Sequence, residues 1–161
     1  MFKYRKATAI DLEKIWNKDI AFHPDDQRWE NWKTEYISYN ERKLATTFVV
    51  VDKTEPVGQI TVLLSPECKA VDGRLELANG KTIANMNAFR IDKKYEGEGH
   101  ISTLFKLAED YARKKGIKTL TIGVEAKETR NIAIYLHFGF TKFVSASVED
   151  NELILYYSKD I

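Results

Sequence analysis

Residues 91–104 are the first stretch whose residue types and spacing could support chemistry. An apolar strand end is followed by a loop with glycines at positions 97 and 99, and then by apolar residues at helical spacing. Backbone N–H groups at the start of a helix have no partner inside it and carry the positive end of its dipole. Because glycine lets a ligand approach the backbone closely, this loop could bind a phosphate or pyrophosphate. A Gly-x-Gly loop can also serve only to turn the chain.

Residues 124–140 are the second such stretch. They predict a strand, a polar break and a short helix over 129–138 that contains Tyr135 and is followed by Gly139 and Phe140. A tyrosine hydroxyl, with an ordinary pKa of about 10, can give a proton to a departing thiolate beside it. The alternative is an aromatic side chain in the core whose hydroxyl lies at the rim.

Together the two stretches resemble the GNAT family of N-acetyltransferases, which transfer the acetyl group of acetyl-CoA to an amine. The family's loop, commonly V-x-P-x-[YF]-[RQ]-G-x-G-[IV]-[GA]-x-x-L, lies over residues 91–104, and its later helix, N-x-x-A-x-x-x-Y-x-x-x-G-[FY], lies over 128–140. The resemblance implies acetyl-CoA as co-substrate and Tyr135 as the general acid. The cofactor-binding residues that it implies are Phe89, Ile91, Glu96, Gly97, Glu98, Gly99, His100, Ile101, Ser102 and Asn131.

Some positions depart from the family pattern. Glu96 stands where Arg or Gln is usual, Glu98 adds a second carboxylate, and Ile101 replaces a small residue. Each carboxylate would repel a pyrophosphate by about 1 kcal/mol at 4 Å in water. Glu128 takes the family's Asn position, and Asn131 could serve that role from the next helical turn. These departures keep open an alternative, a catalytically weak acyl-CoA-binding, sensor or partner module. A nucleotide-binding domain ranks lower because the third glycine of the dinucleotide fingerprint is missing.

The acceptor and the general base are less well marked. The strand before the loop, residues 82–90, contains no Asp or Glu, so Asn85 and Asn87 could only orient an amine or a water, and Glu125 is a candidate base. Acidic residues after the first helix, at 25, 26 and 30, would suit a cationic amine, although an N-cap and a solvated turn explain them better. Trp16, Trp29, Trp32 and Tyr36 have the spacing of core residues. We expect a small-molecule or peptide amine as acceptor.

Hydrophobic periodicity predicts the elements that would position these residues. Strands are expected at 2–6, 46–51, 57–65, 119–124, 140–148 and 152–157, with a turn at Asp150 and Asn151 between the last two. Helices are expected after Thr8, which has capping-box spacing with Asp11, after an N-cap at Asp25 or Asp26, at 99–115 and at 129–138. Asn79-Gly80 predicts a hairpin between 75–77 and a strand that runs from 82 to 91. The order predicts an α+β fold, an α/β/α sandwich with a mixed, mostly antiparallel sheet of about seven strands and helices on both faces.

Composition limits the class of protein. The 161 residues are 43% hydrophobic and 30% charged with a net charge of +1, which predicts one globular domain over 1–161 and no nucleic-acid partner. No apolar run reaches the roughly 18 residues of a membrane span, and no signal core opens the chain, so we expect a soluble cytoplasmic protein. Cys68 and the three His show no metal-ligand spacing, so no metal is expected. A homodimer through the last strands is a further expectation from the resemblance.

Overall fold

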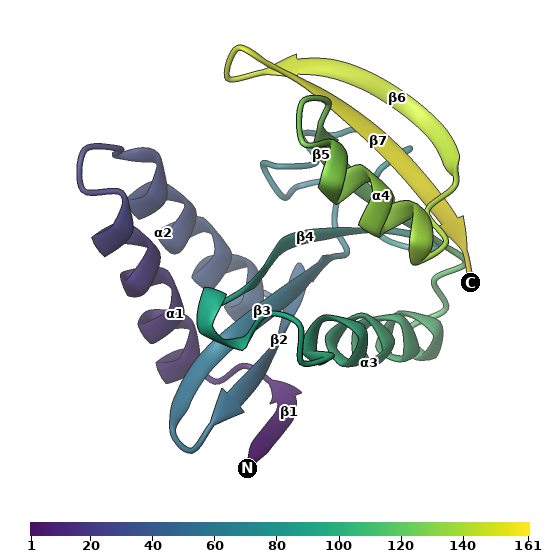
Figure 1. Ribbon diagram of the computed structural model, residues 1–161. Helices are drawn as coiled ribbons and strands as arrows, with labels where there is room; N and C mark the ends of the chain where they lie inside the picture. Colours follow the sequence, from purple (N-terminus) through teal and green to yellow (C-terminus); the bar gives the residue numbers. More distant parts are fainter. The chain divides into compact units, whose positions relative to one another are not determined.

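A computed structural model describes residues 1–161 and contains one sheet in the strand order β1-β2-β3-β4-β5-β7-β6 (Figure 1). The elements are β1 (Phe2–Lys6), α1 (Ala9–Phe22), α2 (Arg28–Glu41), β2 (Ala45–Asp52), β3 (Glu55–Leu63), β4 (Ile83–Ile91), the 3-10 turn η1 (Lys93–Tyr95), α3 (His100–Lys114), β5 (Thr119–Glu125), α4 (Thr129–His137), β6 (Lys142–Glu149) and β7 (Glu152–Asp160). β4 and β5 are parallel, whereas β1 and β2, β5 and β7, and β6 and β7 pair antiparallel. The predicted mixed, seven-stranded α+β fold is confirmed.

The chain forms two compact units. The first unit consists of Met1–Val62 and Ala88–Asp110, and the second of Leu63–Asn87 and Tyr111–Ile161. β4 therefore contributes its second half to the first unit and its first half to the second. α3 is divided in the same way near its C-terminus.

In the first unit, α1 and α2 run side by side (Figure 1). α1 begins with the predicted capping box, in which the Thr8 side chain accepts from the Asp11 N–H at 3.1 Å and Asp11 accepts from the Thr8 N–H at 2.7 Å. α2 differs from the prediction in detail: its N-cap residue is Gln27, whose side chain makes no capping bond. Asp26, one position earlier, accepts from the Arg28 N–H instead.

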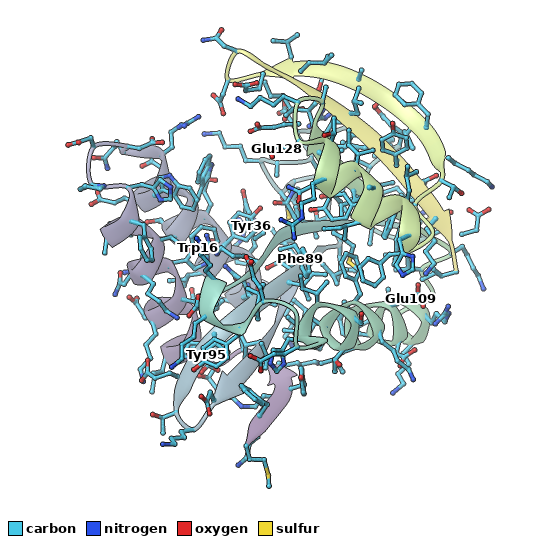
Figure 2. The ribbon with its side chains drawn as sticks, viewed as in Figure 1. Trp16, Tyr36, Phe89, Tyr95, Glu109 and Glu128 are labelled. Atoms are coloured by element: carbon cyan, nitrogen blue, oxygen red, sulfur yellow. The ribbon has the colours of Figure 1, made fainter.

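The core of the first unit lies between these helices and the sheet. It contains fully or nearly fully buried residues from each element, namely Leu12, Ile15, Trp16, Tyr36, Tyr39, Val49, Val51 and Val57. Trp16 and Tyr36 are confirmed as core aromatics, whereas Trp29 and Trp32 are only half-buried. The rings of Trp16 and Tyr36 lie 5.0 Å apart (Figure 2).

In the second unit, β6 and β7 form a hairpin that continues the β5–β7 pairing (Figure 1). The predicted turn at Asp150 and Asn151 is confirmed, with φ of 50° and 65° at these residues. The predicted hairpin at Asn79-Gly80 is wrong, because residues 75–77 form a turn and not a strand. The Asn79 side chain accepts from the N–H groups of residues 81, 82 and 83, so it closes a local turn in place of a strand ladder. No helix is both long and apolar enough to cross a membrane.

Candidate active site

The second half of β4 leaves the regular ladder. Its pairing with β5 runs from Ile83 to Met86 and ends there. Ala88 then adopts φ of +47°, a left-handed conformation that is uncommon for a residue with a Cβ. A residue of this kind interrupts the ladder and re-aims the strand that follows it. Residues 89–91 thus form a separate short segment that belongs to the first unit.

The pairing of residues 89–91 with β3 defines which way their backbone N–H and C=O groups point. The Asp92 N–H donates to Val57 O at 2.7 Å. Continuing that antiparallel register places Gly58 opposite Ile91 and Gln59 opposite Arg90. In agreement, a Cβ on Gly58 would lie 2.6 Å from Ile91 Cδ1. Because hydrogen-bonding groups alternate sides along an antiparallel strand, the N–H and C=O groups of Phe89 and Ile91 point away from β3. A ligand with amide groups could pair with that edge of β4.

The loop before α3 offers a row of free donors. Gly97 and Gly99 adopt φ of 79° and 84°, and the N–H groups of residues 97–102 donate no hydrogen bond within the chain. Three of these N–H groups belong to the first turn of α3, where the helix dipole favours an anion. The side chains of Glu96 and Glu98 are exposed. Such a row of donors can bind an anion, and the exposed carboxylate of Glu96 can turn toward solvent.

The side chain of His100 makes contacts that are separate from the row of backbone donors. It is only 4% exposed, its Nδ1 shares a 2.6 Å hydrogen bond with the Tyr4 hydroxyl, and its ring lies 4.3 Å from that of Phe2. Its Nε2 is 3.4 Å from a carboxylate oxygen of Glu98. The imidazole therefore fastens the loop to β1. Tyr4 lies 96 positions from His100 in the chain, so nothing local in the sequence indicated this anchor.

The helix that carries the expected general acid, α4, lies in the second unit. Tyr135 is half-buried, and burial raises the pKa of its hydroxyl above the ordinary value. The hydroxyl therefore stays protonated at neutral pH, as a proton donor must. Asn131, one turn earlier, is exposed, and Glu128 occupies the N-cap position without a capping bond (Figure 2).

The candidates for the general base are placed less favourably. Asn85 is buried and donates to Thr121 Oγ1 at 3.0 Å, while its own oxygen accepts from Asn87 at 3.1 Å. Glu125, at the end of β5, lies 3.6 Å from the Lys127 ammonium. No group of three or more His, Cys, Asp or Glu side chains could hold a metal ion.

The acidic residues after α1 are mostly engaged locally. Asp26 forms an ion pair with Arg28 at 2.8 Å, and Glu30 accepts from Gln27 at 2.7 Å. Asp25 is exposed. The expectation that this segment suits a cationic amine gains no support from these contacts.

Comparison with known proteins identifies the family and the fold. Residues 9–140 match the sequence pattern of the acetyltransferase (GNAT) family. A GNAT-family protein from Desulfovibrio desulfuricans superposes with a TM-score of 0.76 at 9% identity, covering 99% of each chain. A ribosomal-protein-alanine N-acetyltransferase from Brucella melitensis gives 0.72 at 16% identity, again with 99% of each chain covered. The PaiA N-acetyltransferase from Thermoplasma acidophilum, in complex with coenzyme A, gives 0.66 at 17% identity, covering 100% of this chain and 99% of that one.

No match was found among curated protein sequences. The family match nevertheless spans most of the chain, from α1 to the residue after Gly139. This protein belongs to the GNAT family of acetyltransferases, whose co-substrate is acetyl-CoA.

Proposed function

We propose that this protein transfers the acetyl group of acetyl-CoA to a primary amine by direct attack, with Tyr135 as the general acid. The observation that carries the proposal is the row of unpartnered N–H groups at 97–102 ahead of α3. Such a row is suited to a pyrophosphate, and it belongs to a chain of the GNAT family. The separated segment of β4 provides further support, because its outward-pointing backbone groups can hold an extended ligand arm.

The proposed roles follow from these positions. When bound, acetyl-CoA supplies a thioester whose carbonyl carbon is open to attack. The outward backbone groups of Phe89 and Ile91 would pair with the amides of the pantetheine arm and fix its course along β4. The donors of residues 97–102 would hold the phosphates, and Asn131 of α4 is proposed as a further cofactor contact.

Tyr135 is the proposed proton donor to the departing sulfur. As the acceptor nitrogen forms its bond to the carbonyl carbon and the carbon–sulfur bond breaks, the Tyr135 hydroxyl would give its proton to the sulfur. The neutral attacking amine loses one proton as its bond to the carbonyl carbon forms, and this proton returns through water to the Tyr135 phenolate, so the overall reaction takes up and releases no net proton. The role requires Tyr135 to be protonated, and its raised pKa supports this.

An assay of free-thiol release tests the proposal. Purified protein is incubated with acetyl-CoA and a panel of amines, and the release of thiol is followed over time. We expect release that depends on at least one amine, together with an acetylated product detected by mass. Binding of acetyl-CoA without any amine-dependent release would instead indicate the binding-module alternative.

A further inference from the structure

A group of buried polar atoms in the first unit lacks hydrogen-bond partners. They are Nε1 of Trp16 and both Nε2 and Oε1 of Gln59, whereas the buried Oδ2 of Asp19 is ion-paired with Arg90. Trp16 and Gln59 are 4% and 0% exposed, respectively. Buried polar atoms are nearly always hydrogen-bonded, because an unmade bond costs free energy. Their concentration on α1 and β3 therefore points to a polar ligand and not only to a packed core.

Arg90 brings these atoms into one cluster. It stands opposite Gln59 in the β3–β4 register, on the sheet face opposite to that of its neighbours Phe89 and Ile91. Its guanidinium carbon lies 5.9 Å from the Trp16 ring centre and 5.7 Å from that of Trp29, and it pairs with Asp19. We call Trp16, Asp19, Gln59 and Arg90 the Arg90 cluster.

The Arg90 cluster is reachable from outside. The Arg90 side chain is 29% exposed, whereas that of Asp19 is 9% exposed. Trp29 is half-buried and stacks on the exposed ring of His23, with 4.1 Å between ring centres. The accessible edge of the Arg90 cluster therefore combines an aromatic ring with a charged group.

The chemistry of the Arg90 cluster favours one class of ligand. Arg90, the Trp16 indole and the Gln59 amide offer N–H donors, while Asp19 and the Gln59 oxygen offer acceptors. Burial lowers the pKa of Arg90 to about 10, a shift that Asp92 opposes. Asp19 balances the charge of Arg90, so the pair as a whole is neutral. A carboxylate could accept from Arg90 and from the unpartnered N–H groups of Trp16 and Gln59. An amine could donate to Gln59 Oε1 or to Asp19, so the two sets of groups together suit a zwitterion.

We propose that the Arg90 cluster binds the carboxylate of the acceptor, so that the acceptor is an amine which also carries a carboxylate, as a free amino acid does. The inference rests on the proposed function, because it names the substrate class of the same reaction. Arg90 lies between Phe89 and Ile91 on the strand that would hold the pantetheine arm, so a ligand bound by this cluster lies beside that segment.

The first test compares three probes by calorimetry: L-phenylalanine, phenethylamine, which lacks the carboxylate, and 3-phenylpropionate, which lacks the amine. We expect L-phenylalanine and 3-phenylpropionate to bind and phenethylamine to bind at least about tenfold more weakly, the typical loss for one charge-assisted hydrogen bond. Equal binding of phenethylamine, preferential binding of spermidine, or no binding of 3-phenylpropionate would overturn the inference.

The second test uses variants. Arg90→Gln should weaken 3-phenylpropionate binding by roughly 10-fold to 100-fold, whereas Arg42→Gln, which changes an exposed arginine after α2, should leave it unchanged. Gln59→Met removes two unpartnered polar atoms at nearly constant volume. If Gln59 has only a structural role, Gln59→Met should have equal or higher thermal stability and unchanged binding of 3-phenylpropionate. That result would overturn the place of Gln59 in the site. We expect equal or higher stability together with weaker binding.

These measurements separate the inference from the proposed function. Binding of 3-phenylpropionate needs no acetyl transfer, so the site stands if the probe binds while thiol release fails. Conversely, acetylation of phenethylamine as fast as of L-phenylalanine would keep the proposed function and remove the carboxylate site.

Discussion

Tyr135 carries the proton in the proposed reaction, and its substitution gives the sharpest test at the scale of a residue. Tyr135→Phe keeps the ring and removes the hydroxyl, so turnover should fall about 100-fold, the lower range for a positioned general acid. The Kd of acetyl-CoA should not change, because the hydroxyl acts on the departing sulfur and not on the bound ground state. Steady-state kinetics and calorimetry on the same preparation measure both quantities.

Tyr157→Phe provides a matched control, since Tyr157 lies on β7 at the same half-buried level and has no proposed role.

The pH dependence of turnover has a definite sign. Burial raises the pKa of Tyr135, so the proton-donating form persists as the pH rises, and ionisation of this group should not reduce the rate below pH of about 10. Unchanged turnover in Tyr135→Phe would remove the residue from the mechanism.

Glu96 is a second residue with a predictable effect. Its exposed carboxylate precedes the free donors of residues 97–102 and would repel the phosphates of coenzyme A. Glu96→Gln should therefore tighten acetyl-CoA binding by about twofold to fivefold at low salt, with a smaller gain at high salt because ions screen exposed charges. Glu76→Gln, an exposed substitution in the second unit, serves as the control. Weaker binding in Glu96→Gln would mean that the carboxylate contributes a contact.

At the scale of elements, the loop before α3 depends on backbone conformations that glycine adopts easily. Gly97→Ala introduces no clash, because nothing lies within 4 Å of the added Cβ, but φ of +79° costs about 1–2 kcal/mol for a residue with a side chain. Gly73→Ala meets the same open space at φ of +73° in a loop of the second unit. Both variants should lose similar stability, whereas only Gly97→Ala should lose affinity for acetyl-CoA. Equal affinities in the two variants would exclude the loop from the site.

Elements with strong local signals could be predicted from the sequence. The capping box of α1, the turn at Asp150 and Asn151, and the helix after Gly99 depend on residues close together in the chain. Asn79-Gly80 misled the prediction because Asn79 uses its side chain to close its own turn. The surrounding loop is held by contacts that no local pattern reveals, including the hydrogen bonds of Arg74 to Glu149 and Tyr156.

The candidate site likewise contains residues that the sequence could indicate and residues that it could not. The motif residues of the loop and of α4 stand out in the sequence because the family spacing is local, and their roles stay predictions. The Arg90 cluster could not be predicted, because it depends on the β3–β4 register and on the α1 face that meets it. The free edge of β4 depends in turn on the left-handed conformation of Ala88, which a residue with a Cβ rarely adopts.

At the scale of the whole molecule, the residues with proposed roles are distributed over the two compact units. The loop, the β4 segment and the Arg90 cluster belong to the first unit, and Tyr135 and Asn131 to the second. β4 and α3 run from one unit into the other, so the chain joins the units through two regular elements. The organisation of residues 1–161 as a single domain stays a prediction, and so does a homodimer.

Thermal unfolding with and without acetyl-CoA tests the central claim most directly, with ATP and NAD as controls. A ligand at 100 times its Kd stabilises the folded state by about 2.7 kcal/mol. For a chain of this size that free energy raises the midpoint by several degrees. We predict this rise with acetyl-CoA and not with NAD or ATP. No rise at millimolar acetyl-CoA would contradict the account, because the donors at 97–102 would then hold no pyrophosphate.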